Sequence, residues 1–270
     1  MGEKTLKDCR DYIITDKAEG CGGLYFDTSV INLKATNHVR HGSFSVRRYA
    51  SGKKVDRRIL VLDDDLIGDA AICALRARTI DGTINPVELI LLGFDVEDYE
   101  KLHACRGEFY TNRKLDLSFS GIVKTGRGKE LKEFIGNIFK ASEGYDNSVL
   151  GYSLSGLFAA SLFLENDYFD RLGLISPVLW VDPNVGRSLQ EAVFMQPERT
   201  VFLAAGEMEE ELIRKNDETI KPENGRPFNS SFSGNLQSLV HQVGMGCDHT
   251  ATITAMMDRA ILALASDRSL

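Results

Sequence analysis

The sequence has few cysteines and no pair of them at the spacing of a metal-binding or redox motif. Its five cysteines are odd in number and scattered along the chain (Cys9, Cys21, Cys73, Cys105 and Cys247). This pattern predicts neither a zinc site nor a disulfide framework. No run of apolar residues approaches the roughly 20 that a membrane-spanning helix needs, and the first residues lack the apolar core of a signal peptide. We therefore expect reduced thiols, no contact with a membrane and a cytoplasmic location.

The chain also lacks an excess of positive charge. Its formal net charge of −7 argues against nucleic acid as a general partner. Basic residues are nevertheless concentrated in one short stretch, which holds Arg47, Arg48, Lys53, Lys54, Arg57 and Arg58. We interpret this stretch as the solvated face of a hairpin, and electrostatic steering of an anionic substrate is the functional alternative.

Repeats, low-complexity tracts and linkers are absent, so we expect a single domain over residues 1–270. Short apolar runs alternate with helical patterns, which is typical of an α/β fold with a mostly parallel sheet and helices on both faces. The predicted buried strands are 58–63, 87–93, 148–151, 172–175 and 200–205. Apolar residues at helical spacing predict helices over 131–139, 236–243 and 253–264.

Residues 1–57 differ from the rest because they are polar and have a β-rich pattern. We expect them to form antiparallel edge strands of the same sheet, with a turn at residues 37–42.

Residues 149–159 (VLGYSLSGLFA) combine an apolar run, a sharp turn at Ser153 and the start of a helix. Such a turn lifts a serine hydroxyl above the sheet edge and points the amides of the following helix at it. Gly151 and Ser155 are the small residues required where strand and helix backbones approach, although Ser155 stands where the motif usually has glycine. Ser153 is therefore the candidate nucleophile. A tight turn with a buried, helix-capping serine is the alternative.

A serine nucleophile needs an imidazole to take its proton, and a carboxylate to orient that imidazole. In this architecture the acid and then the histidine follow the serine along the chain. His241 falls in the predicted helix 236–243, whereas His249 lies in a glycine-rich loop just before the last predicted helix. Because such a loop can fold back over the sheet edge, His249 is the candidate base.

The acid is expected directly after strand 200–205. Four carboxylates stand there, at Glu207, Glu209, Glu210 and Glu211. We choose Glu209, with Glu207 as the alternative. A serine–histidine pair that works without a strong acid stays open.

The reaction also needs hydrogen-bond donors for the oxyanion that develops on the substrate. The Leu154 amide, directly after the nucleophile, is one candidate, and the second is the amide of Asp64 or Asp65 in the loop after strand 58–63. Asp63, Asp64 and Asp65 lack the spaced partners of a calcium loop, so we expect no metal site there.

Further segments occur in a consistent order around these candidates. They are LDD at 62–64, TGRGKE at 125–130, Tyr145, GYSLSGLFA at 151–159, ISPVLW at 175–180, AGEME at 205–209 and GCDH at 246–249. Together they resemble an esterase branch of the α/β-hydrolases that includes the trilactone siderophore esterases. The resemblance runs from about residue 58 to the C-terminus, and this family usually has LDG where the chain has LDD.

The resemblance implies a single-domain α/β-hydrolase with no metal or organic cofactor and a small-molecule ester as its partner. It implies Ser153 as nucleophile, His249 as base, and the amides of Leu154 and Asp64 as oxyanion donors. Arg106 stands where these esterases carry an arginine near the substrate. Two more substrate-binding candidates lie in the matching segments, Tyr152 and Trp180.

The expected activity is hydrolysis of a siderophore-type or other small carboxylic ester through an acyl-enzyme. Acyl transfer, or hydrolysis of a different small ester, is the alternative among enzymes. Asp64 and Ser155 replace two glycines of the family, so a non-catalytic protein of the same fold that binds a ligand or partner is the alternative outside them.

Overall fold

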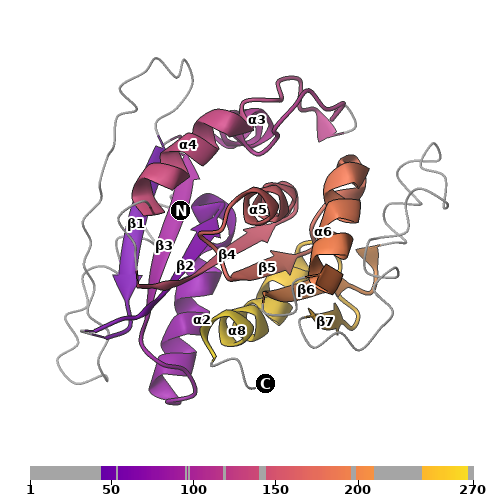
Figure 1. The fold of residues 1–270 in the computed structure, drawn as a ribbon. Helices are drawn as coiled ribbons and strands as arrows, with labels where there is room; N and C mark the ends of the chain where they lie inside the picture. The colour runs from indigo at the N-terminus through magenta and orange to yellow at the C-terminus, as the bar shows by residue number, and fades with distance from the viewer. Residues whose placement is uncertain are drawn as a thin grey trace, which may run out of the picture.

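A sheet of seven strands organises the part of the chain that the structure describes, in the order β1-β3-β2-β4-β5-β6-β7 (Figure 1). The computed structural model describes residues 44–52, 54–94, 96, 98–117, 120–139, 144–195, 199–209 and 239–266. The strands are β1 (Phe44–Ala50), β2 (Arg57–Leu62), β3 (Val87–Phe94), β4 (Asp146–Tyr152), β5 (Arg171–Ile175), β6 (Thr200–Gly206) and β7 (Leu239–Gly244). Neighbouring strands are parallel throughout, except that β1 runs antiparallel to β3. The predicted mostly parallel sheet with an antiparallel N-terminal strand is confirmed.

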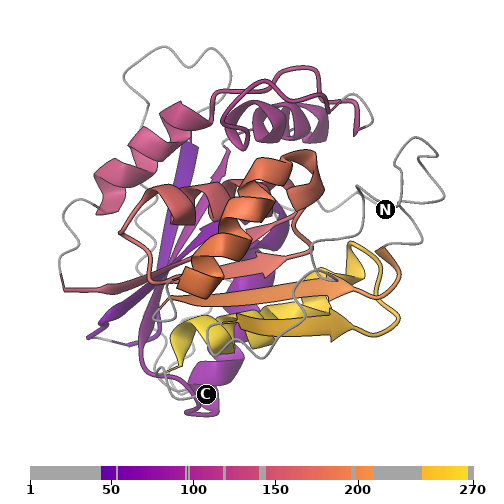
Figure 2. The same ribbon diagram turned by 45° about the vertical axis from the view of Figure 1, so that its right-hand side comes forward.

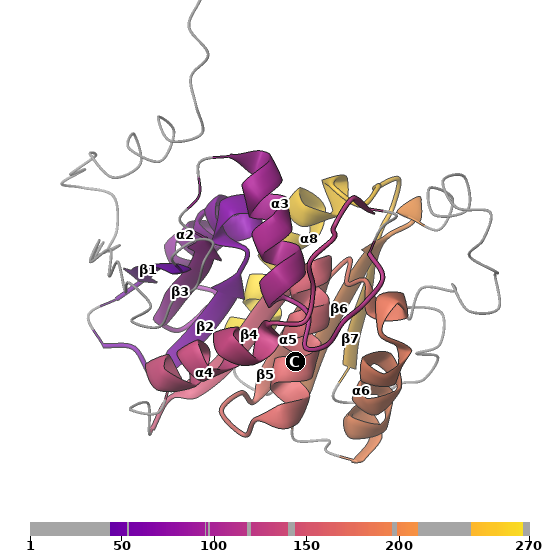
Figure 3. The ribbon, with the colours of Figure 1, turned by 90° about the horizontal axis from the view of Figure 1, so that it is seen from above.

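Helices cover both faces of the sheet (Figures 1 and 2). One face carries α2 (Asp69–Ile80) and α8 (Ala251–Ala265). The other carries α3 (Tyr99–Phe109), α4 (Gly128–Phe139), α5 (Leu154–Glu165) and α6 (Pro183–Met195), which Figure 3 shows from above. None of these helices combines the length and apolar character needed to cross a bilayer.

The two cores explain why the strands read as unbroken apolar runs. In β2, Leu60 and Leu62 pack in the core on the α5 face, whereas Ile59 and Val61 pack in the core on the α2 and α8 face. All four side chains are fully buried. A strand buried on both faces needs apolar residues at every position, which is typical of a parallel sheet between two helical layers.

The predicted helix over residues 236–243 is wrong. Residues 239–244 form β7, which pairs in parallel with β6 from Val201↔Leu239 to Gly206↔Gly244. A short apolar run does not distinguish a strand from a buried helical turn by periodicity. His241 therefore lies in an edge strand rather than in a helix.

The predicted hairpin of basic residues is also wrong, because β3 lies between β1 and β2 in the sheet. Its arginines form ion pairs across the fold rather than one solvated face. Arg47 pairs with Asp64, Arg48 and Arg58 pair with Glu88, and Arg57 pairs with Asp146. This pairing partly balances the charge of the four arginines within the protein, which weakens the case for steering of an anionic substrate. The turn expected at residues 37–42 lies outside the described residues.

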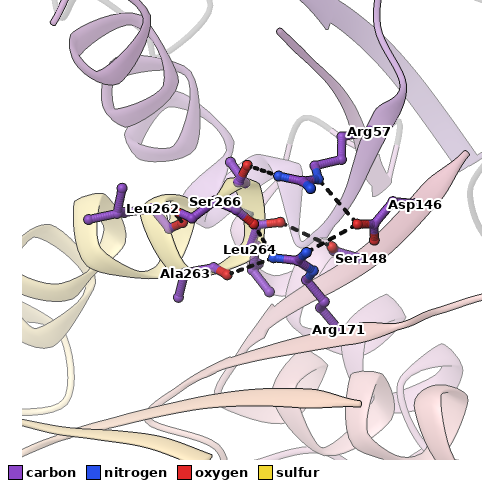
Figure 4. A network of polar contacts seen from close by, with 9 residues as sticks. Arg57, Asp146, Ser148, Arg171, Leu262, Ala263, Leu264 and Ser266 are labelled. Atoms are coloured by element: carbon purple, nitrogen blue, oxygen red, sulfur yellow. Dashed lines mark hydrogen bonds and ion pairs between the residues drawn. The ribbon is translucent and has the colours of Figure 1, made fainter. Parts of the chain in front are cut away.

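Two arginines fix the C-terminal end of α8 to the sheet (Figure 4). Arg57 and Arg171 both bind Asp146 Oδ2, through Nε at 3.2 Å and Nη2 at 3.1 Å. Arg57 also donates to the carbonyl of Ala265, and Arg171 to that of Ser266. The last carbonyls of a helix have no partner within the helix, so these bonds satisfy them and hold α8 against the starts of β2 and β5.

Candidate active site

Ser153 lies on a strained turn between β4 and α5. Its backbone angles are φ 55 and ψ −117, a region that residues other than glycine rarely adopt. A Cβ atom at Gly151 would lie 2.4 Å from the carbonyl oxygen of Ser155, so the turn requires glycine at that position. The side chain of Ser155 fits because its Oγ accepts from the amide of Tyr152 (2.9 Å) and donates to the carbonyl of Tyr152 (2.8 Å). The serine in place of the usual glycine thus bonds the turn internally.

The structure brings Ser153, His249 and Glu209 together at the carboxyl edge of the sheet. His249 Nε2 lies 2.9 Å from Ser153 Oγ, and His249 Nδ1 lies 3.3 Å from Glu209 Oε2. The His249 side chain is 37% exposed and that of Glu209 is 11% exposed. The imidazole is therefore partly exposed and Ser153 is half-buried, whereas the carboxylate behind them is shielded.

The second oxygen of Glu209 is held on the side away from His249. Oε1 accepts from Ser176 Oγ (2.5 Å) and from the amide of Gly206 (2.6 Å), and Thr252 Oγ1 lies 3.2 Å away. Burial opposes ionisation, but the hydrogen bonds from His249, Ser176 and Gly206 outweigh it and lower the pKa of the Glu209 carboxyl below its ordinary value. The carboxylate is thus ionised near neutral pH and fixed in orientation.

Glu207, the alternative acid, has a different contact. Its Oε2 accepts from the amide of Gly246 at 2.8 Å, and its own amide donates to the carbonyl of Gly244. At Gly206, a Cβ atom would lie 2.3 Å from the carbonyl oxygen of Cys247. Glu207 and Gly206 therefore shape the loop that carries His249, and Glu209 is the carboxylate that faces the imidazole.

The sequence reasoning missed Ser176 and Thr252. Ser176 follows β5 with a φ of 46, which is unusual for a residue with a side chain, and this turn aims its hydroxyl at Glu209. Thr252 lies in the first turn of α8 and is fully buried. In the sequence, Ser176 follows a predicted strand and Thr252 lies near the start of a predicted helix. Neither position indicates that the two side chains share Glu209 as a hydrogen-bond partner.

The two expected oxyanion donors each begin a helical segment. Leu154 is the first residue of α5, and Asp64 is the first residue of η1 (Asp64–Gly68). The first amides of a helix have no acceptor within it. β2 and β4 are neighbouring parallel strands, with Val61 opposite Leu150 as their last pair, and Asp64 and Ser153 both lie just beyond their carboxyl ends. Both segments therefore begin at the sheet edge that carries the serine, and the role of the two amides as oxyanion donors stays a prediction.

Arg106 lies inside the protein rather than on an open surface. It is 7% exposed, and its Nε lies 2.8 and 3.0 Å from the two carboxylate oxygens of Asp63. The amide of Asp63 donates to Tyr110 Oη at 2.9 Å, and Asp63 has a φ of 66. Arg106 and Tyr110 thus hold the turn that presents Asp64, and a contact of Arg106 with substrate stays a prediction.

Tyr152 and Trp180 are the other two candidates for substrate binding, and both lie near the turn at Ser153, which is called the elbow below. The Tyr152 ring packs against the ring of His249 with centroids 4.9 Å apart, and its hydroxyl lies 3.3 Å from the carbonyl of His249. Burial raises the pKa of Tyr152 to about 12, so the hydroxyl stays protonated. Trp180 is half-buried in η3 (Leu179–Val181), and the preceding Val178 donates its amide to the carbonyl of Ser153.

No protein-family model matches the sequence, and a search of curated proteins gives no match. Comparison with solved structures does give matches. The siderophore hydrolase EstA from Aspergillus nidulans matches with a TM-score of 0.65 and 17% identity, over 83% of this chain and 90% of that one. The siderophore hydrolase EstB from the same organism matches with 0.63 and 14%, over 92% and 96%. The enterobactin and salmochelin hydrolase IroE matches with 0.55 and 15%, over 84% and 90%.

The chain has the α/β-hydrolase fold. This agrees with the resemblance to siderophore esterases that the sequence segments carry. In an α/β-hydrolase the nucleophilic serine sits on a strained turn between a strand and a helix. Here the strand that leads into this turn is β4, and it lies at the centre of the sheet, with β1, β3 and β2 on one side and β5, β6 and β7 on the other.

Proposed function

We propose that this α/β-hydrolase is a serine carboxylic-ester hydrolase that works through an acyl-enzyme. The observation that supports this most directly is the continuous contact from Ser153 through His249 to the buried carboxylate of Glu209. A hydroxyl is a poor nucleophile until a neighbouring base removes its proton. Here the base is 2.9 Å away, and its other nitrogen faces an ionised carboxylate.

In the first half of the proposed reaction, Ser153 Oγ attacks the ester carbonyl carbon while His249 Nε2 takes the hydroxyl proton. The carbonyl oxygen becomes an oxyanion that accepts hydrogen bonds from the amides of Leu154 and Asp64. Collapse of the tetrahedral intermediate breaks the bond to the leaving oxygen, and His249 returns the proton to that alkoxide. Alcohol leaves, and the acyl group stays on Ser153.

In the second half, His249 removes a proton from water as the water oxygen attacks the acyl carbon. The second tetrahedral intermediate expels Ser153 Oγ, which takes the proton back from His249. The products are the free acid and the original enzyme. Glu209 holds the imidazole in the tautomer with the proton on Nδ1 and stabilises the imidazolium that forms twice per cycle.

The preferred substrate class is a siderophore-type ester. It is supported by the resemblance to siderophore hydrolases over most of the chain. The charge pattern adds no support for an anionic substrate, because Arg47, Arg48 and Arg58 are paired with carboxylates within the protein.

A fluorophosphonate probe with intact-mass analysis tests the nucleophile. We expect one adduct per chain on the wild type and none on Ser153→Ala. Ser188→Ala, at an exposed position of α6, is the matched control and should take the adduct as the wild type does. A wild type that takes no adduct and cleaves no ester would favour the non-catalytic alternative.

A comparison of substrates tests the substrate class. Ferric trilactone siderophores and simple aryl esters such as 4-nitrophenyl acetate would be offered to the same enzyme, with Ser153→Ala as the blank. Turnover of trilactones at a higher kcat/KM than that of aryl esters supports the siderophore class. Turnover of aryl esters alone would contradict the siderophore class and indicate a general small-ester hydrolase.

A further inference from the structure

The candidate oxyanion loop has an unfavourable charge built into it. Asp64 supplies a candidate amide donor, yet its own side chain is a buried carboxylate. A buried negative charge one side chain away from the amide would repel the negative charge that develops on a substrate oxygen. Such repulsion is only weakly screened inside a protein.

The structure directs this carboxylate away from Ser153. A Cβ atom at Gly68 would meet Asp64 Oδ1, and one at Gly93 would lie 3.0 Å from Asp64 Cβ. The Asp64 side chain therefore extends over Gly68, at the start of α2, and over Gly93 in β3. In the sheet order β1-β3-β2-β4, β3 lies on the side of β2 opposite to β4, which carries Ser153.

Arg47 of the edge strand β1 binds the Asp64 carboxylate at the end of this path. Arg47 Nε lies 2.7 Å from Asp64 Oδ2 and Nη2 lies 2.5 Å from Oδ1, which is the two-bond fork of an arginine on a carboxylate. The side chains of Arg47 and Asp64 are 15% and 5% exposed. Burial disfavours the charged guanidinium, but hydrogen bonds and charge attraction from Asp64 outweigh it and raise the pKa of Arg47 above its ordinary value.

The neighbouring carboxylates have their own partners. Asp63 binds Arg106, and Asp65 Oδ2 accepts from the amide of Phe94 at 2.9 Å. Arg47 also contacts Asp69 at 3.4 Å, but Asp69 is 42% exposed and so partly screened by water. The carboxylate of Asp64, which belongs to the candidate donor residue, is thus bound in bidentate fashion by a residue of β1. This strand precedes the segments that resemble esterases.

We propose that Arg47 is a positioning residue for catalysis, which neutralises the Asp64 carboxylate and holds it away from the oxyanion. This inference rests on the proposed ester hydrolysis and on the Asp64 amide as a donor. Without Arg47, the Asp64 carboxylate has lost its bound cation and its side chain is free to rotate towards the oxyanion. The transition state, which places an oxyanion near Asp64, is then harder to reach.

The test is a pair of substitutions measured with 4-nitrophenyl acetate. Arg47→Met should lower kcat by about 10- to 100-fold with KM changed by less than about threefold, because the oxyanion forms only in the transition state. Adding Asp64→Asn to Arg47→Met removes the unpaired carboxylate and should recover at least about tenfold of the lost kcat. Arg47→Lys keeps the charge but loses the fork, so its kcat should lie between those of Arg47→Met and the wild type.

Arg48→Met is the matched control. Arg48 is the next residue of β1 and its ion pair with Glu88 is also part-buried. Its loss should leave kcat within about twofold of the wild type. All variants would be assayed below the midpoint of their own thermal unfolding, so that a loss of folded protein is not counted as a loss of kcat. Where Arg47→Met does not fold, Arg47→Lys with and without Asp64→Asn makes the same comparison.

The outcomes separate the two proposals. A wild type whose hydrolysis requires Ser153, together with an Arg47→Met kcat within twofold of the wild type, overturns the role of Arg47 and leaves the hydrolase in place. An Arg47→Met loss that Asp64→Asn does not reverse also overturns it, because the damage then does not come from the carboxylate. A wild type that neither turns over esters nor takes the fluorophosphonate overturns both.

Discussion

His249 Nε2 lies 2.9 Å from Ser153 Oγ although the two residues are 96 positions apart in the chain. The parallel sheet produces this contact. Ser153 follows β4, and His249 follows β7, so both turns emerge at the carboxyl ends of their strands. Between them, β5 delivers Ser176 and β6 delivers Glu209 to the same edge.

Replacing His249 by glutamine should abolish most of the activity. Without the imidazole, the proton of Ser153 has no acceptor during attack, and the leaving oxygen has no donor. We expect kcat to fall by about 10⁴-fold or more with 4-nitrophenyl acetate, as it does when the histidine of a serine–histidine–acid triad is removed. His103→Gln, at a part-buried histidine of α3, is the control and should keep kcat near that of the wild type. A loss below about tenfold at His249 would contradict its role as the base.

The two glutamates that follow β6 should differ in their effect. Glu209→Gln removes the charge that faces His249 Nδ1, and we expect kcat to fall by about 10²- to 10⁴-fold. Glu207→Gln alters a bond to the amide of Gly246 and should cost kcat about tenfold at most, since it acts only through the position of the loop. Equal and small effects of the two substitutions would indicate a serine–histidine pair that works without an acid.

Acid should weaken the folded state through Glu209. Its pKa in the folded protein lies below the ordinary value of 4.5, so the ionised form contributes stability that is fully present above that value. This contribution is lost as the pH falls through the lowered pKa. The difference in free energy of unfolding between the wild type and Glu209→Gln should therefore shrink as the pH is lowered below about 4.5. Urea denaturation at each pH measures it, and a difference that grows on acidification would be the contrary result.

Much of the scaffold could be predicted because its signals are local. The strands β2, β3, β4, β5 and β6 are buried on both faces and read as apolar runs, and the elbow at Ser153 is confined to eleven residues. The strand β7 could not be predicted, because a run of six residues at a sheet edge leaves Val243 46% exposed and has no clear period. The fold class follows from the repeated alternation of strands and helices. Predicting β7 as a helix does not change that conclusion.

The contacts within the site could not be predicted from the sequence, because they depend on tertiary structure. Sequence order placed a carboxylate after β6, but only the three-dimensional turn shows that Glu209 faces His249 while Glu207 faces Gly246. The same holds for Arg47 and Asp64, which meet across β3, because β3 lies between β1 and β2 in the sheet. Pairing across a sheet depends on strand order, and the local pattern of charges does not encode that order.

Substitutions at the elbow should reveal its tight packing. Gly151→Ala places a methyl group on the backbone of Ser155, and this clash should cost several kcal/mol of unfolding free energy, about 3 or more. Ser155→Ala removes two hydrogen bonds to Tyr152 and should cost about 1–3 kcal/mol. Gly136→Ala, where nothing lies within 4 Å of the added atom, is the control and should be neutral or stabilising. Chemical denaturation gives all three values, and a neutral Gly151→Ala would contradict the close approach of strand and helix.

The clamp on α8 should contribute strongly to stability. Arg171 is 2% exposed and joins Asp146 of β4 to the carbonyl of Ser266 just after the helix. Arg171→Met keeps much of the side-chain volume but leaves the partly buried carboxylate of Asp146 with one cation fewer and the carbonyl of Ser266 without its donor. We expect a loss of about 2–4 kcal/mol in the free energy of unfolding. Arg259→Met tests an exposed arginine of the same helix, bound to Gln242, and should change that free energy by less than about 0.5 kcal/mol. Equal effects of the two substitutions would show that the buried network does not hold α8 in place.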